Sequence, residues 1–198
     1  GDDEESHQGP VLDAFQRCVT EQREVLLEPY LSGWRGLIRL GAVFSSSPRR
    51  GGQGAAAGVS PRVPALRVAA VHWCWRAGGA GGAGARPDSG CRTLLRLHRA
   101  LRWLQLFLEG LRSGDPRTSV LCTDAYNASL AAHHPWVVRK AATLAFCALP
   151  SRDAFLEIMN VGPPEQAVAV LGEAIPYIGD VYSITQELLA QHKLLDLP

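Results

Sequence analysis

The most regular pattern in the chain lies in residues 92–111, where leucines recur at spacings of three and four residues. This spacing predicts an amphipathic helix with one apolar face. Three arginines share the first half of the opposite face: Arg92, Arg96 and Arg99. The second half carries Trp103 and Phe107, so the helix is cationic at its start and apolar on both faces at its end. An anionic group bound above hydrocarbon would match this gradient, and so would a solvated arginine face on an ordinary core helix.

Helical periodicity also predicts helices before and after this segment. Residues 10–44 have the pattern of two helices separated at Pro29. The later helices are expected over residues 119–134, 135–149, 152–159 and 165–195. We expect Pro135 at the first helical position of the second of these and Ser151 as the N-cap of the third. Pro176 is expected to kink or divide the last one. Because no internal repeat or long heptad array accompanies these helices, the sequence predicts an all-α globular fold.

Residues 45–88 differ in composition from the rest of the chain. From Pro29 to Pro87 there are eight arginines but no aspartate, glutamate or lysine, although about six or seven acidic residues are expected in a stretch of this length. The segments SSSPRRGGQGAAAGVSPRVP and RAGGAGGAGARP consist mainly of Gly, Ala, Arg, Ser and Pro. This composition predicts an irregular or disordered segment.

Composition and motifs limit the classes of function. A length of 198 residues, 46% of them hydrophobic, suits one compact domain. The net charge of +1 argues against a dedicated nucleic-acid binder. Five scattered cysteines without a CxxC pair predict reduced thiols and no zinc site. The chain has no P-loop, no GxGxxG after a predicted strand, no HExxH and no GxSxG, so we expect no catalytic residues, no metal and no cofactor.

A histidine pair marks the end of the helix predicted over residues 119–134. His134 is followed directly by Pro135 and Trp136. A histidine in this position can donate a hydrogen bond to a ligand carbonyl while the next helix starts afresh. A helix-terminal histidine that faces water fits the same spacing. His133 and His134 lack the spaced partners of a metal site.

Three segments carry a resemblance to a known family: GCRTLLRLHRALRWLQLFLEGL, TDAYNASLAAHHPWVVRKAATLAFCALPSRDAFLEIMNVGPPEQA and the terminal HKLLDLP. They resemble the glycolipid-transfer-protein superfamily, and within it the branch that carries ceramide 1-phosphate. The match is nearly continuous over residues 88–198 and resumes over residues 10–44. It implies a two-layer, all-α helical sandwich that forms a single domain over residues 1–198. The implied protein is a monomer without a cofactor.

The resemblance also implies a function and a set of site residues. Proteins of this branch move ceramide 1-phosphate between membranes without making or breaking a bond, so the implied activity is non-enzymatic lipid transfer. Arg92 and Arg96 would hold the phosphate, because a guanidinium contact to phosphate is charge-assisted and often bidentate. His134 would hydrogen-bond the ceramide amide carbonyl, and Trp136 would contact the membrane. The implied setting is the cytoplasm, with transient peripheral association with the Golgi, plasma and other internal membranes.

The chain departs from the family after the segment GAVF and as far as residue 87. There the family has an aspartate that holds the sphingoid amide and, one helical turn later, a lysine that joins the arginines on the phosphate. This chain has SSSPRRGGQG instead. One alternative is therefore a lipid-binding or inactive variant of the fold that lacks transfer. A shifted reading frame or a splicing error would explain residues 45–87, and sequencing the transcript tests that hypothesis. Two further alternatives are an enzyme acting on phosphate esters through His134 and a binder of acidic polymers.

Overall fold

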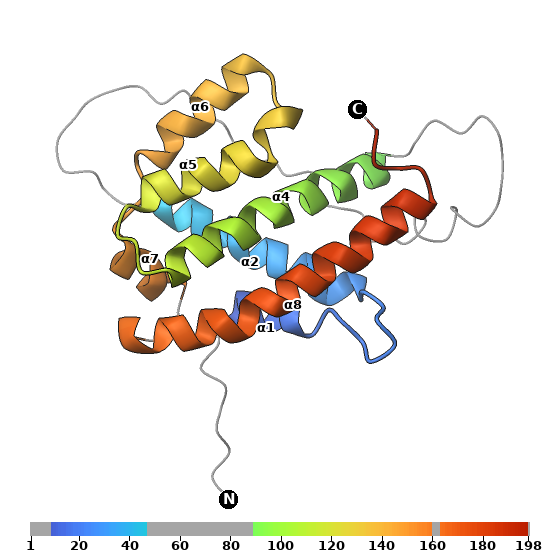
Figure 1. Ribbon diagram of the computed structural model, residues 1–198, viewed down its shortest axis with the longest axis horizontal. Coiled ribbons are helices and arrows are strands. Elements are labelled where there is room, and N and C mark those ends of the chain that lie inside the picture. The colour runs from blue at the N-terminus through green and yellow to red at the C-terminus, as the bar shows by residue number, and fades with distance from the viewer. Residues whose placement is uncertain (1–8, 47–88, 160–162, 198) are drawn as a thin grey trace, which may run out of the picture.

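The computed structural model describes residues 9–46, 89–159 and 163–197, and Figure 1 shows them folded as helices. The elements are α1 (Pro10–Gln16), α2 (Leu27–Ser46), α4 (Ser89–Arg112), α5 (Thr118–Ser129), the short 3₁₀ helix η1 (Ala131–His133), α6 (Trp136–Phe146), α7 (Arg152–Ile158) and α8 (Pro164–Gln191). In the described ranges the only strand-like feature is an isolated bridge between Val19 and Val25. The prediction of an all-α fold is confirmed.

The long helices α4 and α8 lie side by side and run in opposite directions, because α4 begins where α8 ends (Figure 1). Three facing pairs are spaced by seven residues on both helices: His98 with Gln186, Gln105 with Gly179, and Arg112 with Gly172. The first pair is hydrogen-bonded. In the other two, a long polar side chain of α4 lies against a glycine of α8. The pairs fix one antiparallel register along most of the interface.

The leucine stripe of α4 forms the centre of the buried core. Leu101, Leu108 and Leu111 have no exposed surface, and Leu94 and Leu104 are buried. They pack in one cluster with apolar side chains of α1, α2, α5, α7 and α8. Full burial of a leucine stabilises the fold by about 1.5–3 kcal/mol relative to leaving it exposed. The predicted apolar face of this helix is therefore confirmed as a core face.

Helices α1 and α2 pack closely because two glycines of α2 face α1. A Cβ at Gly36 would lie 2.6 Å from Val11 Cγ2, and one at Gly33 would lie 2.9 Å from the Phe15 ring. This close approach brings Phe15 into edge-to-face contact with two aromatic side chains of α2, with ring centroids 6.0–6.3 Å apart. Such pairs add about 0.5–1.5 kcal/mol beyond the area that they bury.

The predicted break at Pro29 is wrong, although two helices do form in residues 10–44. The first helix ends at Gln16. The chain then turns through Thr20 and Arg23, and the φ angle of Arg23 is 59°. The Thr20 hydroxyl accepts from the backbone N–H of Glu24 at 3.1 Å and closes this turn. Pro29 lies in the first turn of α2, where a missing N–H costs no helical hydrogen bond.

Two other expectations about prolines need correction. Pro135 is the N-cap of α6, with φ −67° and ψ 161°, and not its first helical residue. Pro176 lies inside α8, which runs uninterrupted for 28 residues, so it does not divide the last helix, and the alternative of a kink stays a prediction. Because proline has no backbone N–H, the Gly172 carbonyl lacks its usual helical donor. Buried neighbours such as Ile175 and Ile178 nevertheless hold the helix against the core. The predicted Ser151 cap is confirmed, because its hydroxyl accepts from the Ala154 N–H.

Among the described residues, α8 is the one helix that is long and apolar enough to cross a membrane. Its most apolar stretch has a mean hydropathy of 1.2. In this fold one side of it packs against α4, α1 and α7. Ala167, Leu171, Ile178 and Val181 on that side have no exposed surface. We therefore interpret α8 as a core helix, because a core helix passes the same test of length and composition.

The compositionally aberrant segment lies almost wholly outside the described residues. Ser45 and Ser46 belong to the end of α2, and the expectation of irregular structure over residues 47–88 stays a prediction. The departure from the family at SSSPRRGGQG likewise stays a prediction.

Among the described cysteines, Cys18, Cys122 and Cys147 are free thiols. The expectation of reduced thiols is confirmed for these three, and for Cys74 and Cys91 it stays a prediction.

Candidate functional site

The first half of α4 presents two arginines, Arg92 and Arg96, whose hydrogen bonding differs from that of Arg99. Arg92 is half-buried, and its Nε atom is fully buried without a hydrogen-bond partner. Arg96, one turn further, is exposed and forms no hydrogen bond or ion pair within the described part of the chain. Residues four apart lie on the same face of a helix. A buried donor without an acceptor is costly, at about 1–3 kcal/mol and more for a charged group. The pair is therefore suited to an anionic ligand.

Arg99 has a different role from the other two arginines, because the chain itself occupies it. Its Nη2 donates to the carbonyl of Leu195 at 2.9 Å. Leu195 belongs to the C-terminal tail that follows α8, and Leu194 and Leu197 in the same tail pack against the core. The tail is thus held beside the arginine face, which is the side of α4 that carries Arg92, Arg96 and Arg99. The sequence presents the three arginines as equivalent, whereas within residues 9–46, 89–159 and 163–197 only Arg99 has a protein partner.

The predicted histidine site lies between η1 and α6. His134 has extended backbone, with φ −117° and ψ 140°, because a residue before proline is disfavoured in the helical region. Its Nδ1 atom is 2.7 Å from the hydroxyl of Tyr126 on α5. The half-buried imidazole thus has one nitrogen bonded to the protein, and Nε2 has no protein partner within the described residues.

The arginine face and the histidine pair lie within electrostatic reach of each other. Partial loss of hydration lowers the pKa of His133, whose side chain is exposed, and the positive charge of Arg99 lowers it further. Loss of hydration raises the pKa of Tyr126, while the charge of Arg139 on α6 acts in the opposite direction. Neither α6 nor the first five turns of α4 contains an acidic residue. This end of the molecule therefore favours an anion.

A row of aromatic rings leads from His134 into the core. The rings are in contact in the order His134, Tyr126, Phe146, Trp103, Phe107 and Phe155, with centroids 5.2–6.1 Å apart. The Trp103 indole N–H donates to the Cys122 carbonyl at 3.4 Å, so its polar atom is satisfied and its ring faces apolar neighbours. The polar end of the site thus continues directly into hydrophobic interior.

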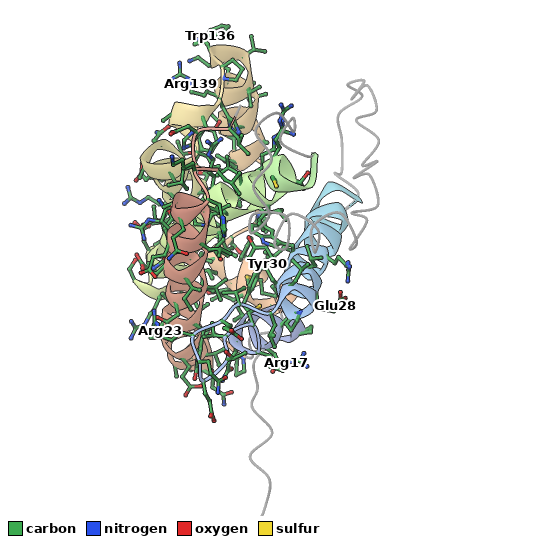
Figure 2. The ribbon with its side chains drawn as sticks, turned by 90° about the vertical axis from the view of Figure 1, so that its right-hand side faces the viewer. Arg17, Arg23, Glu28, Tyr30, Trp136 and Arg139 are labelled. Atoms are coloured by element: carbon green, nitrogen blue, oxygen red, sulfur yellow. The ribbon has the colours of Figure 1, made fainter. Side chains whose placement is uncertain are left out.

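Helix α6 has most of its large apolar side chains on the outside of the protein, whereas Phe146 at its end packs inward against Tyr126 and Trp103. None of its residues is buried, and Trp136, Val137 and Leu144 are 63%, 67% and 73% exposed. Figure 2 places Trp136 and Arg139 together at one end of the molecule, with Arg17 and Glu28 at the other. Exposed apolar residues beside cations are typical of a surface that docks to a membrane or to a partner.

The structure places Arg92 and Arg96 on α4, His134 between η1 and α6, and Trp136 at the start of α6. In the described ranges no group of three or more His, Cys, Asp or Glu side chains could hold a metal ion. Sequence reasoning missed Tyr126 as the partner of His134. No periodicity could have found it, because η1 interrupts the helix between the two residues.

Comparisons with known proteins place this architecture in a family. The family model described as glycolipid transfer protein (GLTP) matches residues 77–161. The ceramide-1-phosphate transfer protein of Homo sapiens is 52% identical over 207 residues, which cover 95% of this chain and 94% of that protein. The protein of the same name from Danio rerio is 44% identical, with 95% and 96% covered.

Solved structures agree with the sequence relatives. The apo form of mouse ceramide-1-phosphate transfer protein superimposes with a TM-score of 0.70 at 45% identity, covering 95% of this chain and 98% of that one. The human protein in complex with 12:0 ceramide 1-phosphate gives 0.68 at 50% identity, with 95% and 97% covered. The chain belongs to the glycolipid transfer protein family. The resemblance seen in the sequence and the two-layer helical fold that it implied are both confirmed.

Proposed function

We propose that this chain is a non-enzymatic transfer protein that moves ceramide 1-phosphate between membranes. The observation that carries the proposal lies on the arginine face of α4, where, among the described residues, the buried Arg92 Nε has no acceptor and Arg96 has no partner. A phosphate monoester carries about 1.5–2 negative charges and three acceptor oxygens. Two guanidinium groups on one face can each offer it a bidentate, charge-assisted contact. The relatives of known name and ligand support this choice of lipid.

His134 would select the ceramide part of the ligand. Its Nε2 atom is free to donate to the amide carbonyl, while Tyr126 holds the other nitrogen. A phosphate alone would use only the arginines. The combination of a phosphate contact and an amide contact distinguishes a phosphorylated sphingolipid from inorganic phosphate.

The hydrocarbon chains would enter the interior beside the aromatic row that begins at Tyr126. A chain of twelve CH₂ groups costs about 10 kcal/mol to expose to water, so a carrier has to shield it during transfer. The rings of Trp103, Phe107 and Phe146 provide apolar surface directly below the polar groups. No bond is made or broken in this process, and no metal or cofactor takes part.

Docking to the membrane would use the outer face of α6. Trp136, with an apolar ring and a polar N–H, is typical of side chains at a membrane–water interface. Arg139 and Lys140, both exposed, would face anionic lipid head groups. We propose a monomer that works in the cytoplasm and associates transiently with the Golgi, plasma and other internal membranes.

Transfer of fluorescent ceramide 1-phosphate between vesicles tests this function. The parent is expected to transfer ceramide 1-phosphate but not galactosylceramide, and Arg96→Leu is expected to lower the rate at least tenfold through the lost charged contact. Arg17→Leu is the matched control, because Arg17 is exposed, pairs with Asp13 and lies at the opposite end of the molecule from Trp136 (Figure 2).

Two results would contradict the proposal. Equal rates in Arg96→Leu and Arg17→Leu would remove the arginine face from the site. No transfer by the parent, with ceramide 1-phosphate still bound, would favour the lipid-binding variant without transfer, whose cause would then be sought in residues 45–87. Localisation is tested by fluorescence microscopy of the full chain, in which a strictly nuclear or secreted protein would exclude the proposed membranes.

A further inference from the structure

The hydrogen bond between Tyr126 and His134 ties the site histidine to a residue that no motif points to. The hydroxyl of Tyr126 and Nδ1 of His134 are 2.7 Å apart. Tyr126 is only 2% exposed, and its ring packs edge-to-face on Phe146 with centroids 5.5 Å apart. The tyrosine is therefore held by packing, and its hydroxyl reaches the imidazole from a fixed position.

The direction of this hydrogen bond decides what His134 can offer to a ligand. A neutral imidazole has one N–H donor and one bare nitrogen acceptor. If the tyrosine O–H donates to Nδ1, the ring proton lies on Nε2, and Nε2 donates outward. If Nδ1 carries the proton and donates to the tyrosine oxygen, Nε2 becomes an acceptor. Only the first arrangement gives a hydrogen bond to a carbonyl.

Chemistry favours the first arrangement. A phenol is a stronger acid than a neutral imidazole N–H, and the bare imidazole nitrogen is a stronger base than a phenol oxygen. The hydroxyl is therefore the better donor and Nδ1 the better acceptor. Burial raises the pKa of Tyr126, with the charge of Arg139 on α6 acting in the opposite direction, so the tyrosine keeps its O–H proton to donate. His133 on η1 lies within electrostatic reach of both His134 and Arg99 of α4.

We propose that Tyr126 is a positioning residue that fixes His134 in the tautomer with the proton on Nε2, so that the histidine presents a donor to the amide carbonyl of the lipid. This inference rests on the proposed function of the site and adds a residue to it. Tyr126 acts through His134 and has no contact with the lipid itself. The site would thus accept lipids with a carbonyl at this depth and disfavour those with a donor there.

The tautomer is measured directly by ¹⁵N NMR of the histidine rings in the lipid-free chain at pH 8, with the His134 signals identified by their loss in His134→Gln. The parent is expected to show the Nε2–H form. Tyr126→Phe keeps the ring that packs on Phe146 but removes the hydroxyl, so the His134 signals are expected to shift towards a mixture of both tautomers. Tyr182→Phe is the matched control, because Tyr182 stacks on a different histidine, His98.

The transfer assay gives the functional readout. Tyr126→Phe is expected to lower ceramide 1-phosphate transfer about tenfold, and Tyr182→Phe to stay within twofold of the parent. An Nδ1–H tautomer in the parent, or an unchanged tautomer in Tyr126→Phe, would overturn the role of Tyr126. The parent spectrum decides this point even if a variant folds poorly. A parent that shows Nε2–H but transfers no lipid would instead refute the proposed function and leave the tautomer assignment standing.

Discussion

Helices α4 and α6 are both rich in apolar residues, yet they use them in opposite ways. On α4, Leu101 and Leu108 have no exposed surface and form the centre of the core. On α6 no residue is buried, and Trp136 and Leu144 are more than 60% exposed. Apolar content alone therefore does not say whether a helix stabilises the fold or forms a docking surface. The neighbours decide, because α4 is covered by α8 and α5, whereas α6 contacts mainly α5.

The largest expected effect comes from a buried leucine of α4. Leu108→Ala is expected to lower the free energy of unfolding by about 3 kcal/mol, from lost burial and from the cavity left behind. Leu144→Ala on α6 is the matched control and is expected to change it by less than about 0.5 kcal/mol. Urea unfolding followed by circular dichroism measures both. A comparable loss in the two variants would mean that α6 belongs to the core.

The second effect concerns membrane association. Trp136→Ala is expected to weaken binding to anionic vesicles about tenfold, because the indole no longer contributes apolar area at the interface. The unfolding free energy is expected to stay within about 0.5 kcal/mol of the parent. Vesicle co-sedimentation measures the binding, with Tyr177→Ala, at an exposed aromatic of α8, as control. Equal weakening in both variants would remove the special role of α6.

The third prediction tests the interior of the α4–α8 interface by pH. Burial lowers the pKa of His98, the bond to Gln186 opposes this, and Arg99 adds to it. The unfolded chain therefore binds more protons than the folded one below the ordinary histidine pKa of about 6.5. Stability is fully present above that pH and is lost as the pH falls below it, by at most about 1.4 kcal/mol per pH unit for one proton.

Urea unfolding between pH 8 and pH 5 measures that slope. His98→Gln is expected to flatten it, because an amide does not titrate. His133→Gln is the matched control at an exposed histidine, where solvent screening keeps the contribution small, and most of the slope is expected to remain. If the two variants flatten the slope equally, His98 is not the group responsible.

The smallest expected effect on stability comes from adding a methyl group to a glycine in the α4–α8 interface. Gly172→Ala is expected to stabilise the chain by about 0.5 kcal/mol, because alanine is the better helix former and the crowded neighbour is the mobile end of the exposed Arg112 side chain. Gly36→Ala has the opposite expected sign, since Val11 is stiff and only 2.6 Å away. Thermal unfolding measures both, and a loss above about 1 kcal/mol in Gly172→Ala would contradict this account.

The sequence predicted most of the helical fold and the location of the arginine face, because helix periodicity is a local property. The leucine stripe of α4 and the Ser151 cap need no information from distant residues. The end of α1 at Gln16 could not be predicted, since the apolar pattern continues through Cys18 into a turn closed by Thr20. The uninterrupted α8 likewise depends on tertiary packing that compensates for Pro176.

Only part of the candidate site could be predicted from the sequence, because some of its contacts depend on how the chain folds and not on local periodicity. The roles of the four residues carried over from the resemblance stay predictions. That Arg99 is already occupied by Leu195 depends on a contact between residues 96 positions apart. The pairing of Tyr126 with His134 crosses the irregular turn at η1. Both relations are set by the folded chain and leave no periodic trace in the sequence.

The fastening of the tail by Arg99 has a practical consequence for how transfer is assayed. Any fusion partner or fluorescent reporter joined to the C-terminus would start only three residues after a carbonyl that is held at the arginine face. We expect such a reporter to crowd the proposed lipid site and to imitate a loss of function. Labels and affinity tags belong near α1 instead, because Arg17 at the end of that helix lies far from Trp136 (Figure 2).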